Sequence, residues 1–327
     1  MMKVLLTGAS GFVGRHILDS LRARGVATAV LLRPTSDKHF LQDHLAAIEV
    51  RPGSITKPES LRPALAEITH VIHCAGLTRA SRISEFYDAN HLGTSNLVEA
   101  INCQGTRIER LVHISSLAAA GPTTPSRPAR EEDPPHPISE YGKSKLAGEL
   151  AVRTECRAPF TILRPPAVYG PRDSAFLPMF KAVKSHVLPR PSARQTLSLV
   201  FVRDLAEAVV TCLDHRATVG KTYFVASNEH TTARQIAEEI ARQMAVWTLP
   251  CPLPAAALWP VCLAQEVVSR VTAKPSLLNL QKFAELRAPG WVCDPSRLLA
   301  EVGFSCATTL RQGIAATLDW YRQEKWL

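Results

Sequence analysis

The stretch KVLLTGASGFVG (residues 3–14) decides the fold of this 327-residue chain. It begins with the apolar strand KVLLT and passes through a glycine-rich turn into helical apolar spacing that continues to residue 24. A second apolar strand, VATAVLL, follows at residues 26–32. The order strand, helix, strand predicts a β-α-β unit, whose two strands lie parallel in one sheet.

The turn contains three glycines, Gly8, Gly11 and Gly14. Glycines between a strand and a helix let the chain turn tightly and let its backbone approach a pyrophosphate, which then faces the helix N-terminus. Phe12 and Val13 lie between the last two glycines, within the same predicted contact. The sequence therefore predicts that these five residues bind a dinucleotide cofactor.

The alternation of apolar strands and helices continues along the chain. Further strands are expected at HVIHCAG (70–76), RLVHISS (110–116) and FTILRP (160–165), with helices near 86–103 and after Ser139. Strands that are apolar throughout and separated by helices belong to a parallel sheet covered on both faces. We predict an α/β fold, with a doubly wound parallel Rossmann sheet.

A smaller substrate domain is expected to be interleaved with the sheet. After Arg164 the pattern loosens into segments interrupted by prolines, yet residues 199–213 and 222–227 look like a further helix and strand of the sheet. The predicted division gives 1–165 plus about 199–227 to the dinucleotide-binding domain, and 166–198 plus 228–327 to the substrate-binding domain.

Composition narrows the possible partners and compartments. The chain is 46% hydrophobic and 20% charged, with a formal net charge of +9. Its Lys and Arg residues are scattered and no nucleic-acid motif is present, so we expect no nucleic acid partner. Eight cysteines form no CxxC pair, eleven histidines show no metal-ligand spacing, and no leader precedes the first strand. The sequence predicts no metal site and a cytoplasmic protein.

The segment Tyr141-Gly-Lys-Ser-Lys145 indicates acid/base chemistry. Use of a phenol near neutral pH means lowering its pKa by about 3 units, or about 4 kcal/mol. Lys145 lies one helical turn beyond Tyr141, and one charge at about 4 Å supplies about that energy. Tyr321 and Lys325 repeat the spacing, but no Ser-bearing strand such as that ending at Ser116 precedes them. We expect a structural role for Tyr321.

With these motifs the chain resembles the extended short-chain dehydrogenase/reductases of the NAD-dependent epimerase/dehydratase superfamily. Within it, the chain looks most similar to the branch of dihydroflavonol reductases and 3β-hydroxysteroid dehydrogenases. The resemblance runs nearly from end to end and rests on TGASGFVG (7–14), HCAG (73–76), NHLGTSNLVEA (90–100), HISS (113–116), YGKSK (141–145), LRPPAVYGP (163–171) and VFVRDLAEA (200–208).

The resemblance implies a catalytic role for four residues. Ser116 would hydrogen-bond the reacting oxygen, and Tyr141 would shuttle the proton. Lys145 would bind the nicotinamide ribose and lower the pKa of Tyr141, while Asn90 would support Lys145 through a water molecule. The strand histidines His73 and His113 are expected to be hydrogen-bonded core residues instead of ligands.

The resemblance also implies cofactor contacts outside the glycine turn. They are Pro166 and Val168 near the nicotinamide, Ala75 and Gly76 along the adenosine, and Ser54 and Ile55 at the adenine. Many relatives carry Asp where this chain has Ser54, so a carboxylate contact to the adenine amine is missing.

The end of the second strand bears on the choice of cofactor. A carboxylate here suits the ribose hydroxyls of NAD, whereas Arg accommodates the 2′-phosphate of NADP. The strand ends at Leu32-Arg33, and the first acid is Asp37. The sequence favours NADP(H), with NAD(H) as the alternative and a solvated strand-end charge as the non-functional interpretation of Arg33.

Three functions are compatible with these motifs. The leading one is an NADP(H)-dependent oxidoreductase that interconverts a ketone and a secondary alcohol, with Tyr141 as acid/base. A nucleotide-sugar epimerase or dehydratase is the alternative. Those enzymes usually carry an Arg-Asp pair where this chain has Leu197 and Ser198, although Arg190 and Arg194 are near. A non-catalytic cofactor-binding protein is the second alternative.

Residues 243–265 contain no charge and four prolines, which disfavour a membrane span. The remaining interpretations are a packed helix, a lid over an apolar substrate, or a peripheral contact with a membrane through residues 247–264. The resemblance favours the lid and a hydrophobic small-molecule substrate. Arg270 and Lys274 could then meet anionic headgroups if the segment also rests on a membrane. A homodimer is also compatible with the sequence.

Overall fold

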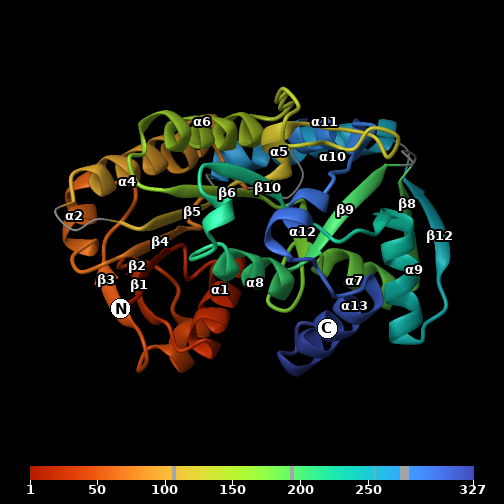
Figure 1. Ribbon diagram of the computed structural model, residues 1–327. Helices are drawn as coiled ribbons and strands as arrows, with labels where there is room; N and C mark the ends of the chain where they lie inside the picture. The colour runs from red at the N-terminus through yellow and green to blue at the C-terminus, as the bar shows by residue number, and fades with distance from the viewer. Residues whose placement is uncertain (105–107, 192–194, 254, 273–279) are drawn as a thin grey trace.

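The computed structural model describes residues 1–104, 108–191, 195–253, 255–272 and 280–327. Its main feature is a seven-stranded sheet with the order β10-β6-β5-β4-β1-β2-β3, in which every pair of neighbours is parallel (Figure 1). The strands are β1 (Lys3–Thr7), β2 (Ala27–Leu32), β3 (Glu49–Pro52), β4 (His70–His73), β5 (Arg110–Ile114), β6 (Phe160–Arg164) and β10 (Lys221–Phe224).

Helices cover both faces of this sheet, because its strands are apolar on both sides. On one face, α1 (Phe12–Ala23) and α8 (Val202–Thr211) bury their apolar sides in a shared core with the strands. On the other face, α4 (Gly93–Asn102) and α6 (Glu140–Glu155) do the same (Figure 1). The predicted doubly wound parallel sheet is confirmed.

A second group of elements lies beside the carboxyl-terminal side of the sheet (Figure 1). A four-stranded sheet joins β9 (Thr196–Phe201) to three short strands, and a two-stranded sheet pairs β8 (Val187–Pro191) with β12 (Leu249–Leu253). The short strands are β7 (Ala167–Tyr169), β11 (His230–Thr232) and β13 (Gly290–Trp291). A separate apolar core beneath them includes α7 (Leu177–Lys184), α9 (Ala233–Met244) and α13 (Leu310–Gln323).

The chain passes between the two groups more than once, which is the interleaving that the sequence suggested. Strand β10 completes the edge of the seven-stranded sheet and α8 packs against α1, whereas residues 199–201 belong to β9 in the second sheet. The domain boundaries themselves stay a prediction.

The remaining helices are short, apart from the 18-residue α10. They are α2 (Leu61–Ala64), α3 (Ile83–Tyr87), a π-helical turn (Asp88–Leu92), α5 (Leu117–Ala120), α10 (Ala255–Thr272), α11 (Leu280–Arg287), α12 (Ser296–Val302) and the 3₁₀ turns His39–His44, Pro58–Ser60 and Arg216–Thr218. Pro260 lies inside α10. Among the described residues, no helix combines the length and the apolar character that crossing a membrane requires.

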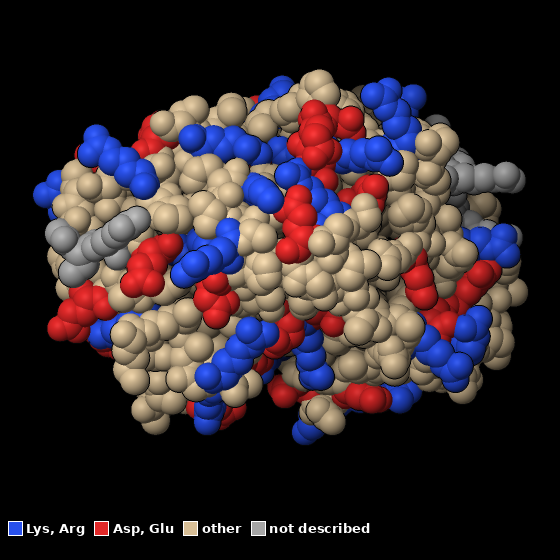
Figure 2. Space-filling model, viewed as in Figure 1, with Lys and Arg blue, Asp and Glu red and all other residues tan. Residues whose placement is uncertain are grey.

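The surface in Figure 2 shows Lys and Arg interspersed with Asp and Glu over the visible face. Among the described residues, some charges are paired across elements, for example Arg24 with Glu207 and Lys221 with Glu301. Mixed charges of this kind give no continuous positive strip on this face for a phosphate backbone to follow.

Candidate active site

The glycine turn after β1 is closed so tightly that side chains do not fit. Gly8 has φ +76°, and a Cβ added there would lie 2.6 Å from the backbone nitrogen of Ala75. A Cβ on Gly14 would lie 2.1 Å from the carbonyl oxygen of Gly8. Both distances are far below a van der Waals contact, so the turn requires glycine at these two positions.

The N-terminus of α1 follows directly and is open for an anion. Gly11 is its N-cap, no side chain caps the helix, and no acidic residue occupies its first turn. The first backbone N–H groups of a helix have no partner within the helix and attract negative charge. Phe12 and Val13, at the start of α1, are half-buried there. A helix N-terminus of this kind suits an anion, and pyrophosphate binding by these residues stays a prediction.

Tyr141, the predicted acid/base, lies where α5 and α6 meet. Ser116 caps α5, and Ser139 caps α6 just before Tyr141. A Cβ on Gly142 would lie 2.3 Å from the carbonyl oxygen of Ala118, so the two helix starts touch backbone to backbone. This close packing places Ser116 near enough to the Tyr141 phenol to lower its pKa. The predicted pair is therefore assembled.

The electrostatics of Tyr141 differ from the sequence prediction. Burial raises its pKa to about 12, and the hydrogen bond with Ser116 lowers it only in part. The sequence predicts that Lys145 lowers this pKa, but Lys145 Nζ donates to the carbonyl oxygen of Ile114 at 2.7 Å. Loss of water from around the phenol is thus the larger effect, and the protonated form of Tyr141 is favoured.

Lys145 is buried, and burial lowers its pKa from 10.5 to about 8. The Cys74 thiol and the Glu149 carboxyl oppose this change by stabilising the ammonium form. A Cβ on Gly76 would approach both Lys145 Nζ at 3.7 Å and Asn90 Oδ1 at 2.7 Å. Gly76 therefore leaves the space above Lys145 open.

This shift predicts how pH affects stability. Between about pH 8 and 10.5 the unfolded chain binds more protons at Lys145 than the folded chain, so folding becomes more favourable as pH rises. From about pH 8 to 9.5, wild type should gain about 1.5 kcal/mol more unfolding free energy than Lys145→Met. Urea unfolding without added cofactor measures this difference. If the unfolding free energy depended on pH equally in the two proteins, the lowered pKa of Lys145 would be contradicted.

Asn90 is buried in the π-helical turn and holds two segments together. Its side-chain amide accepts from Leu77 N at 2.8 Å and donates to Leu77 O and to Ser144 Oγ, each at 2.9 Å. Ser144 precedes Lys145, so Asn90 fixes the chain on either side of the lysine. The predicted water-mediated contact between Asn90 and Lys145 stays a prediction.

The two strand histidines behave differently. His73 lies between Thr7 and Thr94, at 2.8 and 3.0 Å, and so connects β1 to α4. Its prediction as a hydrogen-bonded core residue is confirmed. His113 stacks 5.2 Å from His73, but neither of its ring nitrogens has a hydrogen-bond partner among the described residues. His113 is a buried core residue as predicted, but the prediction that it is hydrogen-bonded was wrong.

The predicted adenosine contacts gather at the carboxyl ends of β2, β3 and β4. Ala75 follows β4, and its N–H donates to Thr7 Oγ1 at 3.1 Å. Ser54 and Ile55 follow β3, where the Ser54 hydroxyl bonds Thr56 Oγ1 at 2.9 Å. Arg33 follows β2 and its side chain is exposed, with no ion pair to the described residues. These positions line one edge of the sheet, as dinucleotide contacts require.

The residues predicted to contact the nicotinamide, Pro166 and Val168, follow β6 close to α5. Pro166 is buried after β6, and the preceding carbonyl, Pro165 O, accepts from Leu117 N at 2.8 Å. Val168 lies in β7, paired with Val200 of β9. The segment therefore links α5, which Ser116 caps, to the second sheet.

Sequence reasoning missed the contribution of α11. Gln281 Oε1 accepts from Glu140 N at 2.9 Å, at the start of α6. The Glu285 carboxylate is near enough to raise the pKa of Tyr141. Phe86 lies on another side, with its ring centroid 6.0 Å from that of Tyr141. No motif signals α11, because its residues come together with Tyr141 only in the folded chain.

A buried ion pair was also missed. Arg164, at the end of β6, donates to both oxygens of Glu149 on α6, at 2.9 and 2.6 Å. Ser115 Oγ donates to Glu149 Oε1 at 2.5 Å. The pair connects the helix that carries Tyr141 and Lys145 to the two strand ends beside it.

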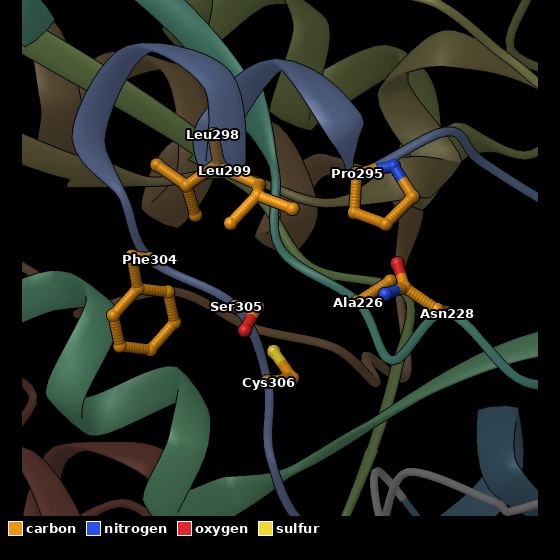
Figure 3. A pocket seen from close by; sticks show the side chains of 8 residues that line it. All are labelled: Ala226, Asn228, Pro295, Leu298, Leu299, Phe304, Ser305 and Cys306. Atoms are coloured by element: carbon orange, nitrogen blue, oxygen red, sulfur yellow. The ribbon is translucent and has the colours of Figure 1, made fainter.

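Two pockets lie away from the predicted catalytic residues. The one in Figure 3, lined by Ala226, Leu298, Phe304 and Cys306 among others, has a volume of about 10 Å³ and holds no more than one water. A cavity of about 280 Å³ lies between β9, β11 and the starts of α9 and α13. The four predicted catalytic residues line neither.

At the two positions where nucleotide-sugar epimerases usually carry Arg and Asp, this chain has no charged side chain. Leu197 packs against the core of the second group, and Ser198 Oγ accepts from Cys293 N at 3.1 Å. Arg194 and Lys274 lie outside the described residues. Within the described part of the chain, no group of His, Cys, Asp and Glu side chains forms a metal site.

Comparison with known proteins places this site in a family. The model of the NAD dependent epimerase/dehydratase family matches residues 4–226. The chain belongs to this family. It is an NAD(P)-dependent enzyme, and the predicted resemblance is confirmed.

Curated family members include both reductases and epimerases. The chain is 31% identical to a ceramide reductase of Caulobacter vibrioides over 326 residues, covering 99% of this chain and 96% of that protein. It is 29% identical to a UDP-glucose 4-epimerase of Vibrio cholerae over 268 residues, covering 76% and 79%. Among solved structures, a Thermus thermophilus UDP-glucose 4-epimerase in complex with NAD shares 26% identity, a TM-score of 0.77 and 98% and 99% coverage.

Proposed function

We propose that this protein is an NADP(H)-dependent reductase that converts the ketone of an apolar substrate to a secondary alcohol. The observation that carries the proposal is the placement of Tyr141 in the first turn of α6, with Ser116 near its phenol and the buried Lys145 one turn further on. A protonated phenol suits the donation of a proton to a carbonyl oxygen. The similarity to a ceramide reductase over nearly the whole chain supports a reductase with a long-chain substrate.

Each of the four predicted catalytic residues has its own role in this reaction. A bound nicotinamide supplies the hydride that attacks the carbonyl carbon. The Ser116 hydroxyl and the Tyr141 phenol hydrogen-bond the carbonyl oxygen, and Tyr141 O–H donates its proton to that oxygen as negative charge develops. Lys145, whose Nζ donates to Ile114 O, would hold the nicotinamide ribose. Asn90 keeps the chain around Lys145 in place.

Nucleotide-sugar epimerisation is the second candidate, since a curated relative and several similar solved structures are epimerases. Such a substrate carries a diphosphate that needs cationic partners. The apolar Leu197 and the hydrogen-bonded Ser198 supply none at the expected positions. This observation favours the reductase.

A direct assay separates the two. The enzyme is incubated with NADPH and a panel of long-chain ketones, and separately with UDP-hexoses. Oxidation of NADPH in step with alcohol formation is expected. Interconversion of sugars without net cofactor oxidation would replace the reductase by an epimerase, and binding of NADPH without either reaction would contradict both.

Cofactor choice gives a separate prediction. Arg33 at the end of β2 can make charge-assisted hydrogen bonds to a 2′-phosphate, worth about 1.5 to 3 kcal/mol, or about 10 to 100-fold in affinity. Arg33→Ala should therefore remove a preference of this size for NADPH over NADH in calorimetric titrations. The exposed Arg322→Ala serves as the control and should keep the wild-type ratio. An unchanged ratio in Arg33→Ala would remove Arg33 from the cofactor site.

A further inference from the structure

Over residues 259–269 of α10, the exposed side chains are apolar, and the side chains turned inward are polar apart from Cys262. At positions 259–268 the exposed residues are all apolar, whereas Gln265 and Glu266 are half-buried and Ser269 is buried beyond them. Glu266 Oε2 accepts from Leu280 N of α11 at 3.1 Å. The exposed residues are Trp259, Pro260, Val261, Leu263, Ala264, Val267 and Val268. We call these seven residues the α10 outer face.

An ordinary surface helix turns its apolar stripe to the core and its polar side to water. In α10 this orientation is reversed. Val267 and Val268 are 55% and 59% exposed, and Trp259 is 49% exposed. Apolar side chains that are contiguous and exposed mark a surface for an apolar partner.

The size of this face distinguishes between two partners. Ten helical residues span about 15 Å, and a helix is about 10 Å wide, so the footprint is about 150 Å². A stable interface between two protein copies buries about 800 Å² on each. A lipid bilayer needs no matching partner surface, and amphipathic helices of this size lie in its plane.

The neighbouring helix adds the charge that such a contact uses. Helix α11 packs against α10 and presents two exposed cations, Arg287 and Lys282, of which Lys282 is paired with Glu285 at 3.0 Å. Cations next to an apolar face favour the negative headgroups of anionic lipids. Through Gln281 the same helix contacts the start of α6, which carries Tyr141. Helix α11 therefore lies between the α10 outer face and the start of α6, which carries Tyr141.

We infer that the α10 outer face rests on a lipid bilayer, with α10 parallel to the membrane plane. This surface goes beyond the catalytic reaction, since it needs neither cofactor nor substrate to bind. It would place the active site beside the phase in which an apolar ketone dissolves. Trp247 and Leu249, which precede α10 and are also exposed, are not needed for the inference.

The test uses the full chain and two kinds of vesicle, one of phosphatidylcholine and one that also contains phosphatidylglycerol. Wild type should co-sediment with both, and more strongly with the second. Val267→Asp combined with Val268→Asp should lower the bound fraction by at least about tenfold, because two carboxylates then replace apolar side chains at the interface. Leu299→Asp, at a 48% exposed position of α12, is the matched control and should bind as wild type does.

A second measurement does not depend on a charged substitution. Vesicles with brominated acyl chains should quench tryptophan fluorescence in wild type and quench it less in Trp259→Phe. Light scattering of the free proteins reports their oligomeric state. Vesicle binding that is absent in wild type, or equal in the double variant, overturns the inference. Dissociation of an oligomer by the double variant also overturns it, since a second copy would then cover the face.

Discussion

Tyr141→Phe should lower the rate of carbonyl reduction by about 10²- to 10⁴-fold, the usual contribution of a positioned proton donor. The phenol is half-buried and protonated near Ser116, so its hydroxyl is the acid that the reaction loses. Phenylalanine keeps the ring and its contact with Phe86. NADPH affinity, measured by titration, should therefore stay within a few-fold of wild type.

Tyr321→Phe is the matched control, since Tyr321 and Lys325 repeat the spacing of Tyr141 and Lys145. The structure buries Tyr321 in the core of the second group of elements, where its hydroxyl donates to Asp173 O at 2.5 Å. Loss of this bond should cost about 1 kcal/mol of stability and leave the rate unchanged. Inactivation by Tyr321→Phe together with an active Tyr141→Phe would show that the site is misplaced.

The sequence was sufficient for features that depend on local spacing. The glycine turn, the parallel strands and the start of α6 after Ser139 each follow from residues within about one turn or one strand of each other. Tyr141 and Ser116 could be paired because the helix and the strand that carry them were both evident, and the resemblance supplied their roles.

Features that depend on long-range packing were not visible in the sequence. The direction of the Tyr141 pKa depends on how much water the fold removes, and Lys145 has a backbone carbonyl, Ile114 O, as its partner. Helix α11 reaches Tyr141 from more than a hundred residues away, through contacts that no motif encodes. The polar inside of α10 is equally hidden, because composition shows that a segment is apolar but not which side it exposes.

The ion pair between Arg164 and Glu149 leads to the largest expected change in stability. Both side chains are buried, and each carboxylate oxygen accepts a hydrogen bond from the guanidinium. Arg164→Leu would leave the Glu149 charge without its partner, which costs about 3 to 5 kcal/mol. Urea unfolding should show this loss. The rate should fall as well, because the pair holds α6 against the ends of β5 and β6 beside Ser116.

Two controls separate the buried charge from a mere loss of contacts. Arg234→Leu breaks the exposed pair with Glu238 on α9 and should cost less than about 1 kcal/mol. Arg164→Leu combined with Glu149→Met removes both charges, so it should recover much of the stability that the single variant loses. If the double variant is less stable than Arg164→Leu alone, the pair stabilises the fold through its own attraction and the unpaired-charge explanation is wrong.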